Sequence, residues 1–399
     1  MTNTTWTCPN CELFLQSVTH PVRCHCGTQT DAGGKPLSRG IGDTVAKITR
    51  AVGIKPCGGC KSRQKLLNAL LPNKKSKRDL LVLVPAGASS SFTDTRGELI
   101  GEMLTPSGIT THVVPIQRAD VDQLQQLLDV VKPRVVINQA MIVGPEQVVQ
   151  LAAGRPKTKW LTINHSSFAD MVRVRNWLKH HCAFLELARD DARMFYGHVD
   201  DRKLINRFNV SRALYVPNVV RVPDAPAGPF YIDDTQPRLS IVSRFDPSKN
   251  ITNQLIAANM IPGCVVELCT HNDARDVLEP FARSLGVNVN WSTFREWPQY
   301  IQWIRDHVDI GLQCSFTESM NYVAIEHQMS GVPVVTGHAV RYTPEYATAV
   351  ADDPRDIARV VRDHIDNYEQ RAASALVESR RFATRNNTEF VDVMQKRLF

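Results

Sequence analysis

The sequence contains no apolar run of about 18 residues, the length at which a helix can cross a bilayer. Its start, Met1-Thr-Asn-Thr-Thr-Trp-Thr7, lacks the basic and then apolar pattern of a secretory signal. Internal repeats and low-complexity tracts are also absent, which excludes a solenoid or a largely disordered chain. We therefore expect a cytoplasmic, globular protein that has no membrane partner.

The chain has 399 residues, of which 43% are hydrophobic and 22% are charged, a composition typical of globular proteins with more than one domain. The formal net charge of +7 is unevenly distributed. Residues 1–79 hold 13 Lys or Arg against 4 Asp or Glu, whereas the remaining residues hold 34 against 36. A basic segment beside a near-neutral body indicates a part of the protein that faces nucleic acid.

From Asp79 onward, short apolar runs alternate with amphipathic helical stretches, which predicts parallel strands covered by helices. We expect strands at 80–84, 109–114, 134–138, 159–164, 183–188 and 212–216, and again at 239–243, 264–269, 287–291, 308–313 and 332–336. The expected fold is α/β, with two Rossmann-like doubly wound lobes at 79–222 and 237–385. A cysteine-rich basic module (1–78) precedes the lobes and a carboxy-terminal helix (386–399) follows them.

The most informative motif is Thr317-Glu-Ser-Met-Asn-Tyr-Val-Ala-Ile-Glu326, between two expected strands. If a helix begins near Ser319, Glu318 and Glu326 lie on one side of it, about 12 Å apart along the axis. Carboxylates at that spacing suit the hydroxyl groups of an extended ligand. The first backbone N–H groups of the helix suit a phosphate, and they belong to Met320, Asn321 and Tyr322.

The string from Thr317 to Val335 resembles the family-4 glycosyltransferases, which are retaining enzymes of the GT-B fold. That family has a Glu-x7-Glu signature before a Gly-x-Pro-Val-Val strand. The resemblance implies a nucleotide-sugar co-substrate and no catalytic metal, with Glu318 on the donor sugar and Glu326 on the ribose. The alternative is that both glutamates are ordinary surface charges.

A second motif, Ile241-Val-Ser-Arg-Phe-Asp-Pro-Ser-Lys-Asn250, resembles the family's first strand of the second lobe. Arg244 and Lys249 stand where the family has the two cations that neutralise the donor diphosphate. The leaving nucleoside diphosphate develops negative charge, which fixed cations stabilise. Alone, the segment would equally fit a surface Arg and Lys beside a turn.

In the first lobe, Gly87 lies in a small-residue loop that resembles the family's flexible loop near the donor. His165 follows an expected strand, like a family position where a His faces the reacting sugar; a purely structural His is the alternative. The chain departs from the family at Val219, where the family has Gly, and at 267–273, where the family has a glycine-rich turn.

The resemblance also implies a mechanism with retention of configuration. The leaving phosphate oxygen would accept the proton of the acceptor hydroxyl on the face from which it departs. The protein then contributes positioning and charge stabilisation.

Paired cysteines near the start of the chain predict structural zinc. The expected ligands are Cys8, Cys11, Cys24 and Cys26, with a third pair at Cys57 and Cys60. The third pair either shares a site with Cys24 and Cys26, or holds a second ion with His20 or His25, or binds no metal. An iron–sulfur cluster is a further alternative.

Residues 40–68 resemble a small cysteine motif of bacteriophage proteins. Together with the basic charge, this motif favours a phage-type enzyme in the host cytoplasm whose acceptor is a hydroxymethylated pyrimidine, such as hydroxymethylcytosine, in DNA. One alternative is a transferase that acts on a glycan, lipid or protein. Another is a zinc-dependent nucleic-acid-binding protein with an inactive transferase fold.

Overall fold

The computed structural model describes residues 4–7, 14–17, 79–85, 91–116, 120–173, 175–199, 202–224 and 231–399. Residues 79–119 and 133–399 form one compact unit, and residues 1–78 and 120–132 form another. Several residues predicted to bind ligands lie outside the described ranges: Gly87, Cys8, Cys11, Cys24, Cys26, Cys57 and Cys60.

In the unit that contains residues 1–78, the described residues form two strands and one helix. β1 (Thr4–Thr7) and β2 (Phe14–Ser17) pair in antiparallel orientation. α4 (Val121–Val131) begins after Asp120, whose side chain accepts hydrogen bonds from the N–H groups of Asp122 and Gln123. The buried residues of α4 recur at helical spacing: Leu124, Leu127, Leu128 and Val131.

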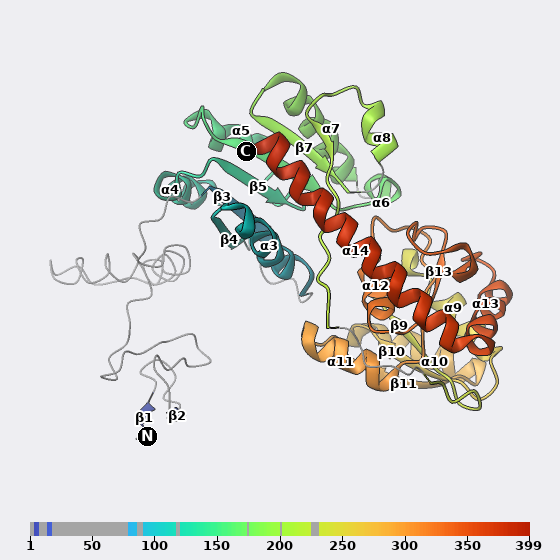
Figure 1. Cartoon of the computed structure of the whole chain (residues 1–399). Coiled ribbons are helices and arrows are strands. Elements are labelled where there is room, and N and C mark those ends of the chain that lie inside the picture. Colours follow the sequence, from blue (N-terminus) through green and yellow to red (C-terminus); the bar gives the residue numbers. More distant parts are fainter. Residues whose placement is uncertain are drawn as a thin grey trace. The chain divides into compact units, whose positions relative to one another are not determined.

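The first lobe of the larger unit is a parallel sheet of six strands in the order β4-β3-β5-β6-β7-β8 (Figure 1). The strands are β3 (Leu80–Pro85), β4 (Thr111–Ile116), β5 (Val135–Gln139), β6 (Lys159–Asn164), β7 (Met194–His198) and β8 (Ala213–Tyr215). The helices are α3 (Ser91–Leu104), η1 (Thr105–Ser107), α5 (Pro145–Ala153), α6 (Phe168–Arg173), α7 (Arg175–Asp190) and α8 (Arg202–Arg207). β3 is a continuous apolar run because helices cover both faces of a doubly wound parallel sheet.

One strand prediction in this lobe is wrong. Residues 183–188 belong to helix α7, whose buried His181, Phe184 and Ala188 follow helical spacing. The strand that fills this place in the sheet is β7, and its sequence, Met-Phe-Tyr-Gly-His, carries no run of aliphatic residues. Gly197 within it allows close packing, since a Cβ there would lie 2.7 Å from Cγ2 of Val216.

The second lobe is also a parallel sheet of six strands, in the order β11-β10-β9-β12-β13-β14. The strands are β9 (Arg238–Val242), β10 (Val265–Cys269), β11 (Asn288–Ser292), β12 (Ile310–Gln313), β13 (Val334–Gly337) and β14 (Thr348–Ala349). The helices are η2 (Pro247–Lys249), α9 (Ile251–Asn259), η3 (Asn272–Ala274), α10 (Arg275–Leu285), α11 (Trp297–His307), α12 (Tyr322–Met329), η4 (Glu345–Ala347), α13 (Pro354–Asp366) and α14 (Tyr368–Leu398). The strand order reverses between β9 and β12, and such switch points are where doubly wound sheets bind ligands.

The long helix α14 (red in Figure 1) contributes to the cores of both lobes. Tyr368 packs in the core of the second lobe. Phe390, Met394 and Leu398 are buried in the core of the first lobe. Residues 386–399, expected as a carboxy-terminal helix, are the last part of α14 and its C-cap.

The predicted architecture of two doubly wound α/β lobes is confirmed. A helix that could span a membrane, which must be long and apolar, does not occur among the described residues.

Candidate functional site

Two loops of the second lobe meet at the carboxyl edge of its sheet. β9 and β12 pair in parallel, with Leu239 opposite Ile310 and Ile241 opposite Leu312. The segments that follow them, 243–250 and 314–321, therefore begin side by side. Hydrogen bonds join these segments: the N–H of Phe316 donates to the carbonyl of Ser248 at 2.8 Å, and Nδ2 of Asn250 donates to the carbonyl of Cys314 at 2.9 Å.

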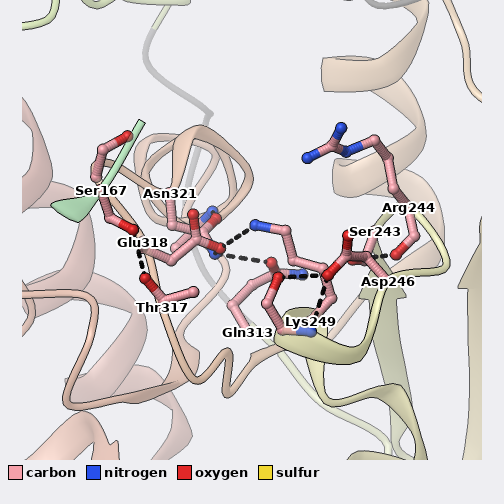
Figure 2. Close-up of polar contacts among 12 residues, drawn as sticks. Ser167, Ser243, Arg244, Asp246, Lys249, Gln313, Thr317, Glu318 and Asn321 are labelled. Atoms are coloured by element: carbon pink, nitrogen blue, oxygen red, sulfur yellow. Dashed lines mark hydrogen bonds and ion pairs between the residues drawn. The ribbon is translucent and has the colours of Figure 1, made fainter. Parts of the chain in front are cut away.

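An ion pair between Lys249 and Glu318 lies at the centre of this edge (Figure 2). Nζ of Lys249 is 2.6 Å from Oε1 of Glu318, and the two side chains are only 19% and 8% exposed. The turn η2 places Lys249 because Oδ1 of Asp246 accepts hydrogen bonds from the N–H and hydroxyl of Ser248. Asn250 then adopts a left-handed conformation (φ 56°) that leads the chain into α9.

Asn321 orients Glu318 and also caps α12. Its Nδ2 donates to Oε1 of Glu318 at 3.2 Å and to Oε1 of Gln313 at 3.0 Å. Its Oδ1 accepts the N–H of Ala324 at 2.9 Å. The hydroxyl of Tyr342 donates to the backbone carbonyl of Asn321. The side-chain amide is thus fully used in fixing the loop against the helix.

The expectation that Glu318 and Glu326 share one helix is wrong. α12 begins at Tyr322, so that Glu318, Ser319 and Met320 lie in the loop before it. The cause is the cap at Asn321, whose backbone is extended (φ −92°, ψ 95°) and therefore not helical. The helix begins at the residue after this cap. Glu326 lies on α12, and Glu318 reaches the site from the loop.

Glu326 accepts a hydrogen bond at its Oε1 from Nε1 of Trp297, at 2.9 Å. Burial, together with the nearby charges of Glu318 and Glu326, holds the pKa of Tyr342 well above its ordinary value. The Tyr342 hydroxyl therefore stays protonated and keeps donating to Asn321.

Arg244 presents an exposed cation beside this cluster. Within the part of the chain that the structure describes, its guanidinium makes no hydrogen bond or ion pair, and Figure 2 shows it standing apart from Lys249. Its backbone carbonyl accepts the hydroxyl of Ser243 at 3.0 Å. The main chain is thus held while the charged group remains available to an anion.

The first lobe contacts the Glu318 loop through residues that follow β6. The hydroxyl of Ser319 donates to the backbone carbonyl of His165 at 2.5 Å. The hydroxyls of Ser167 and Thr317 are also 2.5 Å apart (Figure 2). Hydrogen bonds to the first lobe therefore hold the loop on both sides of Glu318.

His165 is itself held by two side-chain amides. Its Nδ1 lies 2.9 Å from Oδ1 of Asn218, and its Nε2 contacts Oε1 of Gln139. Both ring nitrogens are engaged with protein groups, and the residue offers its backbone carbonyl to the second lobe. The family resemblance instead predicts an imidazole that faces the reacting sugar.

The sequence motifs did not indicate four residues that orient the site: Gln313, Trp297, Gln139 and Asn218. Gln313 joins the two strand ends, since its Nε2 donates to the carbonyl of Val242 at 3.2 Å while its Oε1 accepts from Asn321. A buried polar residue at the carboxyl end of a strand could have revealed Gln313 and Gln139. Trp297 carries no such signal, because only the fold brings it to Glu326.

The site combines two cations, Lys249 and Arg244, with two carboxylates, Glu318 and Glu326. Cations and backbone N–H groups suit a phosphate, and carboxylates suit hydroxyl groups. The described residues include no group of three or more His, Cys, Asp or Glu side chains that could hold a metal ion.

Solved structures of glycosyltransferases share this fold. Sucrose-phosphate synthase from Thermosynechococcus elongatus superposes with a TM-score of 0.60 at 14% identity, over 80% of this chain and 95% of that chain. The HepE protein of Anabaena, in complex with UDP and glucose, has a TM-score of 0.56 at 14% identity, over 79% and 99%. A glycosyltransferase from Rickettsia africae has a TM-score of 0.60 at 11% identity, over 81% and 99%.

At these identities the likeness establishes the fold, and the chain has the two-lobed GT-B α/β fold. No protein-family model and no curated protein matches the sequence.

Proposed function

We propose that this protein is a glycosyltransferase that takes its sugar from a nucleotide-sugar donor. The observation that carries the proposal is the Lys249–Glu318 pair, held at the switch point of the second sheet beside the exposed Arg244. A nucleotide sugar needs acceptors for its sugar hydroxyls and cations for its diphosphate, and the site offers both. The UDP and glucose held by the Anabaena protein of the same fold support this choice.

Each residue of the site has a role in this proposal. Glu318 binds hydroxyls of the donor sugar, and Lys249 and Arg244 neutralise the diphosphate as it leaves. The start of α12 adds the positive end of a helix dipole near the phosphates. The residues around the start of α12 complete the donor site: Ser319, Met320, Asn321 and Tyr322. Glu326 binds the ribose.

The reaction in this proposal proceeds with retention. The bond between the anomeric carbon and the phosphate oxygen breaks, and the acceptor oxygen bonds to the same carbon. The acceptor's proton passes to the departing phosphate oxygen. Lys249 stabilises the negative charge that develops, and His165 borders the reacting sugar. The protein accordingly needs no strong base of its own.

Donor turnover tests this function. The purified protein is incubated with UDP-, GDP-, ADP- and CDP-sugars, and release of the nucleoside diphosphate is measured. Glu318→Gln and Lys249→Met should reduce the rate by about 100-fold or more. Glu146→Gln, which changes an exposed glutamate on α5, should leave it unchanged. If none of these donors binds or turns over, the proposal fails.

We further propose a hydroxymethylated pyrimidine in DNA as the acceptor. The support is the basic charge of residues 1–79 and the phage-like cysteine motif at 40–68. DNA that contains hydroxymethylcytosine is incubated with the protein and the donors. The DNA is then digested to nucleosides, and the nucleosides are analysed by mass spectrometry. An increase in nucleoside mass by one hexose or pentose that Glu318→Gln abolishes would support this acceptor. Donor turnover without such a mass increase would point to a glycan, lipid or protein as the acceptor.

Structural zinc at the paired cysteines is part of the same proposal. Elemental analysis of the purified full chain should find at least one equivalent of zinc, and Cys8→Ser with Cys11→Ser should reduce it. Absence of metal from the unmodified protein would contradict the zinc assignment and leave the transferase proposal intact.

A further inference from the structure

The ion pair between Lys249 and Glu318 joins two groups to which the proposed function gives separate ligands. Lys249 is proposed to neutralise the diphosphate, and Glu318 is proposed to bind the sugar. In the structure, Nζ of Lys249 is instead bonded to Oε1 of Glu318 at 2.6 Å. Within the described part of the chain, that ammonium has no second hydrogen-bond acceptor. A phosphate that takes the ammonium must therefore compete with the carboxylate.

Glu318 depends on this ammonium for charge compensation. Its side chain is only 8% exposed, so water solvates the carboxylate poorly. The other donor to it among the described residues is Nδ2 of Asn321, a neutral amide that lies 3.2 Å from the same Oε1. Figure 2 shows Arg244 standing apart from the pair. Removing the cation from a carboxylate in such surroundings is strongly destabilising.

The needs of these two groups distinguish two kinds of ligand. A bare nucleoside diphosphate brings only negative charge to this part of the site. It takes the ammonium of Lys249 and leaves the carboxylate of Glu318 unpaired beside phosphate oxygens, which repel it. A nucleotide sugar also brings sugar hydroxyls, which donate hydrogen bonds to the carboxylate and replace the ammonium.

We propose that Glu318 makes the site favour a nucleotide sugar over the bare nucleoside diphosphate. It does so by holding Lys249 unless sugar hydroxyls take the place of the ammonium. The same pairing favours release of the nucleoside diphosphate after transfer, because Lys249 returns to Glu318 once the sugar has left. This inference rests on the proposed function, which assigns the diphosphate to Lys249 and the sugar to Glu318.

Equilibrium binding to paired ligands tests this proposal. UDP-, GDP-, ADP- and CDP-sugars are titrated into the full-length protein, and the tightest binder is compared with its nucleoside diphosphate. The unmodified protein should bind the nucleotide sugar at least about threefold more tightly. Glu318→Gln should bind the nucleoside diphosphate at least about tenfold more tightly than the unmodified protein does. The reason is that a neutral amide neither holds the ammonium strongly nor repels phosphate.

The Lys249→Met background separates competition for the ammonium from simple repulsion. Repulsion between Glu318 and phosphate is present with or without Lys249, whereas competition requires the ammonium. The gain in affinity from Glu318→Gln should therefore be at least about fivefold larger when Lys249 is present than in Lys249→Met. Glu345→Gln, which changes an exposed glutamate of the same lobe, is the matched control and should change either affinity less than about twofold.

Thermal melting reports whether each variant is folded. Equal gains in the two backgrounds, or no gain in folded Glu318→Gln, overturn the inference but leave the proposed function intact. Tighter binding of the bare diphosphate by the unmodified protein has the same meaning. Failure of the unmodified protein to bind any of the nucleotide sugars overturns both.

Discussion

Lys249 and Glu318 are 69 positions apart in the sequence, yet their charged atoms lie 2.6 Å apart with little exposure to solvent. The pairing follows from topology, because β9 and β12 are parallel neighbours and the two residues follow their carboxyl ends. The pair is also an energetic constraint, since neither charge is well solvated once its partner is removed.

We expect Lys249→Met to lower the free energy of unfolding by about 3 kcal/mol, because it leaves the carboxylate of Glu318 without a cation. The double variant Lys249→Met/Glu318→Gln should recover most of that loss. Urea unfolding measures both, with Lys157→Met as the exposed control. A double variant as unstable as the single one would show that the two charges do not interact across this distance.

Asn321→Asp should keep the cap of α12 but lose the favourable contact with Glu318. In Asn321→Asp a second carboxylate would replace the amide that now donates to Glu318 at 3.2 Å. Repulsion from Glu318 raises the pKa of the introduced carboxyl in the folded protein above its unfolded value. The variant's stability, relative to the unmodified protein, should therefore be best near pH 5 and fall as the pH rises to 8.

Asn321→Ala is the comparison for this effect. It loses the cap and should cost about 1 kcal/mol with no such dependence on pH. Nucleotide affinity and urea unfolding at pH 5 and pH 8 distinguish the two variants. Equal pH profiles for Asp and Ala would contradict the contact between Asn321 and Glu318.

The hydrogen bond between Thr317 and Ser167 should matter to transfer more than to nucleotide binding. The cations and carboxylates proposed to bind the nucleotide sugar lie in the second lobe, whereas this bond ties the Glu318 loop to the first lobe. The double variant Ser167→Ala/Thr317→Val should lower kcat/KM for transfer about fivefold, from the lost hydrogen bond.

The same double variant should change nucleoside diphosphate affinity by less than about threefold. Thr388→Val, at an exposed position of α14, is the control. A parallel loss of affinity and turnover would mean that these hydroxyls act on the donor itself.

Buried histidines should make the protein sensitive to mild acid. Burial lowers the pKa of His181, His327 and His364 to about 4 and that of His198 to about 3. Their unfolded values lie near 6.5, so the unfolded chain binds more protons below that pH. Stability should therefore fall as the pH drops from about 6.5 toward 4, by up to about 1.4 kcal/mol per pH unit for each histidine.

In His364→Leu, the number of protons that the chain takes up on unfolding in mild acid should fall by about one. Neither ring nitrogen of His364 makes a hydrogen bond to a side chain or backbone group among the described residues, although Nδ1 lies 3.8 Å from Oδ2 of Asp363. The substitution therefore removes a titrating group and only this longer contact with Asp363. Urea unfolding at pH 7.5, 6 and 5 measures the slope, and the exposed His338→Leu is the control. An unchanged slope in His364→Leu would show that His364 already titrates normally.

Much of the fold could be predicted from the sequence because its strands are continuous apolar runs. The limits of β6 (Lys159–Asn164) were predicted to the residue. Residues 183–188 were misassigned because a short apolar run does not distinguish a strand from the buried side of a helix. β7 was missed because it has no run of aliphatic residues and contains Gly197 and His198, which do not indicate a strand.

The site was less predictable, for a physical reason. The motif around Glu318 suggested a helix, but the Asn321 cap determines where that helix begins. The groups that orient the site come from other elements: Trp297 lies 29 positions from Glu326, and Asn218 lies 53 positions from His165. Local patterns carry no information on such pairs, which depend on how the strands are ordered.

The first-lobe core should be unusually sensitive to changes in α14. Phe390 is 1% exposed there, and Phe390→Ala should cost about 3 to 5 kcal/mol. Phe382→Ala, at a half-buried position of the same helix, should cost less. Hydrogen exchange should then show faster exchange in β3 and β5 than in β9 and β12. Equal acceleration in both sheets would instead indicate that the lobes unfold as one unit.

The shared helix α14 has a consequence for how the protein is made. A ribosome synthesises the first sheet early, but Phe390, Met394 and Leu398, which complete its core, emerge only after the whole second sheet. Part of the apolar core of the nascent first lobe therefore stays exposed to solvent until α14 has been synthesised. Final consolidation of both lobes becomes a single late event, and slow translation between the two sheets would prolong exposure to chaperones or aggregation.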